Sequence, residues 1–194
     1  MVTAEHIKIL REKSGASINE CKKALEEAGG DLAKAEEILS RRLGNMAGKR
    51  MGREAKSGIV EAYVHSNGKL GVLVELFAET DFVSRNEGFR ELAHDVALHI
   101  AASAPQYLTS DTIPEDVLNA ARKGFEEEAA KLGKPKNITE QIVEGKIQSY
   151  FDQFVLVNQP FVKNPDKKVS DVINEAIGKF GENIKIGRFT RLEI

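Results

Sequence analysis

The sequence predicts an α+β protein: an N-terminal unit of three helices, followed by a core in which a three-stranded antiparallel sheet packs with helices. Apolar residues recur at the helical period through the first 43 residues. The period changes to two over residues 59–79, around an Asn-Gly pair, and is two again over residues 184–194. We expect two domains, a three-helix domain with a basic linker over 1–52 and an α+β core over 53–194.

The first two helices have clear start and stop signals. The first is expected after Thr3, which can cap it, and it ends near Gly15. Ser17 and Glu20 then stand at capping-box spacing, where each side chain can bind the other residue's backbone amide. The second helix therefore begins after Ser17.

Asp31 is a good N-cap for the third helix. Its apolar face continues to Leu43, and we expect Gly44 to end it. Residues 45–56 are basic, contain two more glycines and lack a strong apolar period. They are expected to form a linker with some helical character.

Two runs rich in β-branched and aromatic residues, 59–66 and 69–79, flank Asn67-Gly68. This dipeptide predicts a hairpin with a two-residue type I′ turn, which would place Tyr63 opposite Val72. Both faces of the hairpin carry apolar residues, so we expect both to be covered. Helices of this chain would cover one face, and a second copy of the chain the other.

Helices resume after the hairpin, and the chain ends in another alternating run. Residues 155–162 are expected to be extended. Residues 184–194 alternate and can join the hairpin as a third antiparallel strand. The four expected helices start at capping signals or next to a proline, at Ser84, Thr112, Asn137 and Ser170.

Composition excludes several classes of protein. No apolar run among the 194 residues approaches the roughly 20 residues that a membrane helix needs. The first residues enter an amphipathic pattern directly, so we expect no signal or transit peptide. A single cysteine, Cys21, excludes an intrachain disulfide framework and any zinc site built on cysteines. A reducing, cytoplasmic setting is expected.

Basic residues concentrate in residues 40–58, where six of them stand against Glu54 alone. This cluster supports an alternative function, a nucleic-acid-binding module that uses the segment from Arg41 to Lys56. However, no aromatic residues alternate with these charges, and residues 57–194 carry 16 basic and 21 acidic residues. A solvated linker is the simpler interpretation.

The sequence offers no set of residues typical of an enzyme. Cys21 falls on the apolar face of a helix, which favours a buried structural thiol. His94 and His99 are five positions apart, the wrong spacing for two metal ligands on one helix face. We expect His94 in solvent and His99 at a helix edge. We expect no catalytic residues, no metal site, no phosphate-binding loop and no cofactor.

One corner of the chain is a candidate binding site. Asp81 and Phe82 stand side by side between the second strand and the next helix. In the simpler interpretation, Asp81 is a turn residue and Phe82 packs against the first turn of the helix. Alternatively, Phe82 projects as an aromatic anchor for a partner protein, with Asp81 as its polar neighbour.

Five segments resemble a known family and follow in its order: 14–25, 79–86, 159–162, 181–184 and 188–189. Together they are similar to the elongation factor Ts family, in its short form with a single core repeat. The resemblance spans nearly the whole chain. The sequence departs from the family pattern in three places. Ser17, Ile18 and Asn19 differ in the first motif, where Asn19 replaces an apolar residue. Phe77-Ala78 replaces a common Asn-Cys, and Gly187 replaces a common Arg.

The resemblance implies a guanine-nucleotide exchange factor for elongation factor Tu, not an enzyme. Mg²⁺ and GDP would belong to the partner, and neither a membrane nor direct nucleic-acid binding is expected. Short members are expected to form homodimers, which would give a 2:2 complex. The segment that enters the partner's magnesium site and dislodges the ion would be Thr80, Asp81, Phe82 and Val83.

The resemblance also implies that the N-terminal three-helix unit is ubiquitin-associated-like and docks on the partner's GTPase domain. The docking residues it suggests are Gly15, Ala16, Ile18 and Lys22. Two further alternatives stay open. One is an adaptor in which the N-terminal unit binds and the core is passive, and the other is an enzyme whose site forms only on folding.

Overall fold

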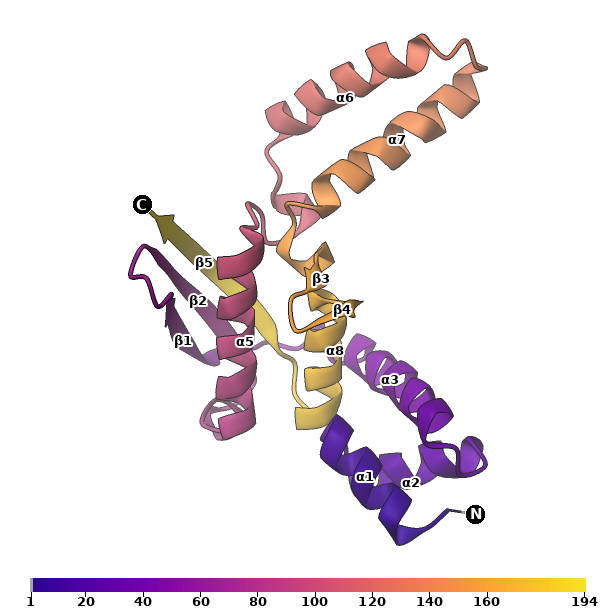
Figure 1. The fold of residues 1–194 in the computed structure, drawn as a ribbon, viewed down its shortest axis with the longest axis vertical. Helices are drawn as coiled ribbons and strands as arrows, with labels where there is room; N and C mark the ends of the chain where they lie inside the picture. Colours follow the sequence, from indigo (N-terminus) through magenta and orange to yellow (C-terminus); the bar gives the residue numbers. More distant parts are fainter. Residues whose placement is uncertain (1) are drawn as a thin grey trace. The chain divides into compact units, whose positions relative to one another are not determined.

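The computed structural model describes residues 2–194 and confirms the α+β class (Figure 1). The three N-terminal helices are α1 (Ala4–Ser14), α2 (Ile18–Glu27) and α3 (Leu32–Gly48). The main sheet has the strand order β1-β2-β5, with β1 (Ser57–Val64), β2 (Leu70–Ala78) and β5 (Lys185–Glu193). The other helices are α4 (Asp81–Ser84), α5 (Glu87–Ser103), α6 (Glu115–Ala130), α7 (Lys136–Asp152) and α8 (Val169–Phe180). The final strand joins the hairpin, as predicted.

Residue contacts divide the chain into two compact units. The first unit comprises the chain up to Glu61 together with Val74–His94 and Ser170–Gly187. The second unit comprises Ala62–Leu73, Asp95–Val169 and Arg188–Ile194.

The three N-terminal helices start where the sequence predicts. The side chains of Thr3, Ser17 and Asp31 each accept a backbone N–H three positions on, at 3.1–3.2 Å. These bonds satisfy amides that the first turn of a helix leaves without partners. The helices enclose a small apolar core of their own, made by Leu10, Ala16, Cys21, Ala24, Leu25, Ala35, Leu39 and Leu43. Cys21 is fully buried in it, which confirms the structural thiol.

The expected end of the third helix was wrong. Helix α3 continues past Gly44 to Gly48. Leu43 and Ala47 lie about one turn apart, and both are buried. Continuing the helix buries Ala47, which outweighs the modest helix-breaking tendency of a single glycine. The expected linker is therefore helical in its first four residues.

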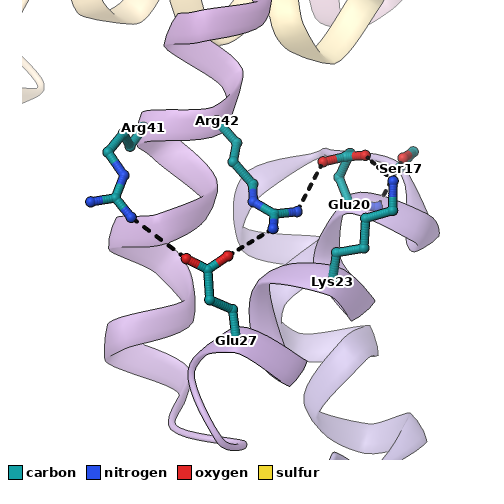
Figure 2. A network of polar contacts seen from close by, with 6 residues as sticks. All are labelled: Ser17, Glu20, Lys23, Glu27, Arg41 and Arg42. Atoms are coloured by element: carbon teal, nitrogen blue, oxygen red, sulfur yellow. Dashed lines mark hydrogen bonds and ion pairs between the residues drawn. The ribbon is translucent and has the colours of Figure 1, made fainter.

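An ion-pair network joins α2 to α3 (Figure 2). Arg42 lies between Glu20, at 3.6 Å, and Glu27, at 2.7 Å, and Arg41 also reaches Glu27, at 3.7 Å. The Glu20 carboxylate binds Lys23 at 3.3 Å as well. Each such surface pair contributes at most about 1 kcal/mol, so the network mainly sets how the two helices are aligned.

The hairpin turn differs from the type I′ prediction. His65 N donates to Leu70 O at 2.8 Å, which agrees with the predicted strand register but leaves residues 66–69 as a four-residue loop. Gly68 N donates to His65 O, and within the loop only Gly68 has a positive φ, of 68°. Asn67 uses its side chain instead, since its Oδ1 accepts Lys69 N at 2.9 Å. This local bond replaces the left-handed backbone of a type I′ turn.

The sequence analysis expected helix α5 to begin at Ser84, but it begins at Glu87. Ser84 belongs to the single-turn helix α4, where it is buried and donates to Asp81 O at 3.2 Å. Asn86 Oδ1 accepts Gly88 N at 2.9 Å and so caps α5. A capping residue was therefore correctly expected in this segment, but it is Asn86 and not Ser84.

The segment expected to be extended over 155–162 is mixed. It forms a short 3₁₀ turn (Leu156–Asn158) and then strand β3 (Pro160–Phe161). Strand β3 pairs antiparallel with β4 (Asn164–Lys168), which sequence reasoning missed because its residues are polar. Helices α6 and α7 lie side by side (Figure 1) and bury Val143, Ile147 and Phe151 among their apolar residues.

His99 is buried at the centre of a hydrogen-bond network in the second unit, not at a helix edge as expected. Its Nδ1 accepts Val162 N at 3.1 Å, so its Nε2 carries the proton and donates to Gln159 Oε1 at 2.9 Å. Gln159 Nε2 then donates to Ser103 O and to Gln153 O. The ring is therefore held neutral, in one tautomer.

Helices α3 and α8 approach closely in the first unit. Gly178 of α8 has no room for a side chain, because an added Cβ would lie 2.8 Å from Leu43 Cβ and 3.1 Å from Leu43 Cα. Beside this contact, Ser40 Oγ donates to Glu175 Oε1 at 2.8 Å.

We predict that the stability of the chain falls between pH 7.5 and 5.5 because of His99. Burial lowers the pKa of His99 from about 6.5, an effect partly offset by its hydrogen bond to Gln159. The unfolded chain therefore binds the extra proton first as pH falls, and folding loses up to about 1.4 kcal/mol per pH unit. Urea denaturation should show this slope in the parent and in the His65→Gln control. An equally steep slope in His99→Gln would contradict the assignment.

We also predict opposite effects for two glycine substitutions. Gly178→Ala must displace α3 through Leu43, and it should cost about 1–3 kcal/mol of unfolding free energy. Gly124 lies inside α6, where an added Cβ would have no atom within 4 Å apart from its chain neighbours and the backbone of its own helix. Gly124→Ala should therefore stabilise the chain by roughly 0.5–1 kcal/mol. Urea denaturation measures both, and equal effects would show that the α3–α8 contact is not tight.

Candidate functional site

The corner between β2 and α4 is built from four residues with different exposures. Strand β2 ends at Ala78 and α4 begins at Asp81, so the chain bends at Glu79 and Thr80. Thr80 is extended, with φ −129° and ψ 158°. The single turn of α4 then presents Asp81 and Phe82 to solvent.

Phe82 does not pack against the following helix. It is 85% exposed, whereas Val83 and Ser84 beside it are each 4% exposed. A single exposed apolar side chain needs no explanation by itself. Here, however, the ring projects from a backbone whose next two residues are anchored in the interior, which is the setting of an aromatic anchor for a partner.

Two carboxylates tie this corner to the turn after α8. Glu182 accepts both donors of Thr80: the backbone N at 2.9 Å on one oxygen and the hydroxyl at 2.6 Å on the other. In the reverse direction, Glu79 Oε1 accepts Asn183 N at 2.6 Å. Each segment therefore holds the backbone of the other.

The two hydrogen bonds from Thr80 to Glu182, called the clamp below, change how α4 begins. Thr80 occupies the N-cap position, but its side chain makes no capping bond, and its hydroxyl instead donates to Glu182. Asp81 lies in the first turn, where a negative charge is favourable. It also pairs with Arg85 at 3.4 Å, and both side chains are mostly exposed, so the pair is weak.

Asn183 extends the anchoring to the segment after α3. Asn183 is 1% exposed, and its Nδ2 donates to Arg53 O at 2.5 Å and to Met51 O at 3.3 Å. Arg53 also pairs with Glu79 at 3.6 Å. Sequence reasoning identified 181–184 as a motif but assigned its residues no role. Thr80 and Glu182 are 102 positions apart, so no local pattern could have linked them.

The four N-terminal docking candidates fall into two groups. Gly15 ends α1 with φ 66° and lies against Lys179, and Ala16 is 2% exposed in the helical core. Ile18 is 54% exposed, and Lys22 is exposed and pairs with Glu26 at 3.8 Å. A shallow groove between α1 and the start of α2 is lined by Ala4, Ile7, Lys8, Arg11, Glu12, Gly15 and Ile18.

Most charges of the basic segment are already paired within the chain. Arg41 and Arg42 bind the carboxylate of Glu27 (Figure 2), and Arg53 binds Glu79. Lys56 lies 2.9 Å from Glu54. These contacts assign the segment a structural role, and nothing in them favours the nucleic-acid alternative.

Within residues 2–194, no group of three or more His, Cys, Asp or Glu side chains is arranged to hold a metal ion. No helix in the described part of the chain is long and apolar enough to cross a membrane. His94, expected in solvent, is exposed and lies 3.2 Å from Glu61.

Comparison with known proteins decides the family. A family model described as Elongation factor TS matches residues 2–194. The chain belongs to the elongation factor Ts family. Elongation factor Ts of Acetivibrio thermocellus is 48% identical over 193 residues, covering 100% of this chain and 90% of the relative. The protein of the same name from Carboxydothermus hydrogenoformans is 45% identical over 194 residues, covering 100% and 89%.

A third relative, elongation factor Ts of Thermotoga petrophila, is 48% identical over 193 residues and covers 100% of this chain and 96% of the relative. The expectation from the sequence motifs is confirmed. The chain acts in translation elongation as the nucleotide exchange factor for elongation factor Tu, and it is not an enzyme.

Proposed function

We propose that this chain releases GDP from elongation factor Tu by inserting the corner Thr80–Val83 beside the partner's magnesium ion and dislodging it. The observation that carries the proposal is Phe82, 85% exposed on a corner with both ends anchored. Phe82 would act as a wedge that shifts packed elements of the partner. Asp81 would bring a carboxylate close to the ion and its ligands. Val83, buried in this chain, would hold the corner in place.

Exchange of this kind requires no bond-making by the chain. It requires binding that is tight to the empty partner and weaker when magnesium and GDP are present. By linkage, the chain lowers GDP affinity by the same factor by which GDP lowers the affinity of the chain. Each factor of ten corresponds to about 1.4 kcal/mol. Since the bound cation neutralises the phosphate charge, displacing it weakens nucleotide binding directly.

The N-terminal unit supplies the docking surface in this proposal. Residues 1–52 would act as a ubiquitin-associated-like domain on the partner's GTPase domain, and residues 53–194 as the core. Ile18 and Lys22 are the exposed members of the suggested set and would make the contact. Gly15 and Ala16 would shape the turn that presents them.

A second copy of the chain is the proposed occupant of the open sheet face. In the second unit, the other face lies against α5, where Arg191 Nε donates to Ala101 O at 3.2 Å. The open face carries an apolar group whose members are between 52% and 95% exposed: Val64, Leu73, Leu192 and Ile194. Such a patch is typical of an interface. A homodimer would give a 2:2 complex with elongation factor Tu, which we place in the cytoplasm with its partner.

We predict that the Asp81→Ala, Phe82→Ala double variant slows stimulated GDP release at least tenfold. Both side chains are exposed, so the fold should survive their removal. Stopped-flow release of fluorescent GDP from elongation factor Tu measures the effect, and thermal unfolding checks the fold. Stimulated release at the parental rate would remove this corner from the mechanism.

We predict that Leu73→Glu makes the chain monomeric, because it places a charge at the centre of the proposed interface. Leu132→Glu is the matched control, since Leu132 is also 52% exposed but lies beyond the end of α6. Size-exclusion chromatography with light scattering gives the mass of each variant. A monomeric parent, or a dimeric Leu73→Glu variant, would exclude this face as the interface.

A further inference from the structure

We propose that Glu182 is a positioning residue for nucleotide exchange, because its carboxylate, acting through Thr80, fixes the direction in which Phe82 projects. This inference rests on the proposed function of Phe82. It adds a residue outside the corner, 102 positions away in the sequence from the threonine that it binds.

The geometry of the clamp supports this role. Thr80 donates its backbone N to one oxygen of Glu182 at 2.9 Å and its hydroxyl to the other at 2.6 Å. Both are hydrogen bonds to an ionised acceptor, which are shorter and stronger than neutral ones. Two bonds to two atoms of one carboxylate fix the orientation of Thr80 as well as its position.

The corner depends on such external anchors. Helix α4 has only four residues, too few to be stable by its own hydrogen bonds. Val83 and Ser84 anchor its far end in the interior. Glu182 anchors the near end, two residues before Phe82. With the near end released, the single turn can pivot on Val83, and the exposed ring loses its fixed direction.

The anchor itself is firmly placed. Glu182 is preceded by Gly181, which ends α8 with φ 76°, and is followed by the buried Asn183. The side chain of Asn183 donates to the backbone carbonyls of Met51 and Arg53. Its backbone N–H donates to the carboxylate of Glu79. The turn that carries Glu182 is therefore fixed by the end of α8 before it and by the hydrogen bonds of Asn183 after it. The exposed side chain of Phe82 depends on this turn for its position.

A competing role for Glu182 is direct contact with the partner. Both of its oxygens are already engaged by Thr80, which favours an internal role. The two roles differ in a measurable way. A positioning residue acts only through the side chains that the corner presents, so its removal should have no effect once Asp81 and Phe82 are both absent. If Glu182 contacts the partner directly, Glu182→Ala should lower the release rate by the same factor whether or not the side chains of the corner are present.

The first experiment is a double-mutant cycle in the full-length chain. Glu182→Ala should lower the maximal rate of fluorescent GDP release from elongation factor Tu about tenfold, equal to about 1.4 kcal/mol. The concentration for half-maximal stimulation should change less than threefold, since docking elsewhere is intact. Glu182→Ala should cause no additional loss in the Asp81→Ala, Phe82→Ala background.

Glu54→Ala is the matched control, because it removes another carboxylate of the first unit, one that pairs with Lys56 at 2.9 Å. It should leave the release rate unchanged. Equal losses from Glu182→Ala with and without the side chains of Asp81 and Phe82 would overturn the positioning role, as would a parental rate in Glu182→Ala. If Phe82→Ala alone has no effect, the proposed function fails too. A parental rate in Glu182→Ala alone leaves that function standing.

The second experiment reads the corner directly, without the partner. The chain has no tryptophan, so Phe82→Trp introduces a single fluorescent reporter at the tip. Time-resolved anisotropy should show faster local rotation of this indole when Glu182→Ala is added, but not when Glu54→Ala is added. Thermal unfolding confirms that each variant is folded. Unchanged local rotation in the Glu182→Ala chain would contradict the clamp.

Discussion

Two reciprocal hydrogen-bonded contacts between distant segments determine the arrangement of the corner proposed to act in nucleotide exchange. Glu182 binds both donors of Thr80, and Glu79 binds the backbone of Asn183. Without them, a four-residue helix at the end of a strand would have no fixed direction. With them, the backbone that carries the exposed Phe82 is already ordered in the free chain, so binding a partner costs less conformational entropy.

This design explains why the chain needs no catalytic group. An exchange factor changes the relative free energies of partner states, and for this it needs a shaped surface with fixed projections. Two polar networks within the chain are accordingly structural: Arg42 aligns two helices, and His99 binds the side chain of Gln159 and the backbone of Val162. In the proposed mechanism, the exposed ring of Phe82 and the neighbouring carboxylate of Asp81 face elongation factor Tu, and the open sheet face is covered by a second copy of the chain.

Sequence reasoning succeeded where the determining contacts are local. The caps at Thr3, Ser17 and Asp31 each involve a residue three positions away, and the hairpin register followed from alternation around a turn. It failed where a side-chain hydrogen bond or the burial of a residue outweighed the local backbone preference. Helix α3 passes Gly44 because Ala47 is buried, and the type I′ turn is absent because the Asn67 side chain forms its own bond.

The amino-acid sequence by itself determined the class of the fold, the start of the N-terminal helices and the family. These depend on interactions within about one helical turn or on motifs read in order along the chain. Only the tertiary structure decided that Phe82 faces solvent, that His99 is buried and that Glu182 reaches Thr80. The reason is physical: exposure and contacts across 102 positions exist only once distant segments have packed together.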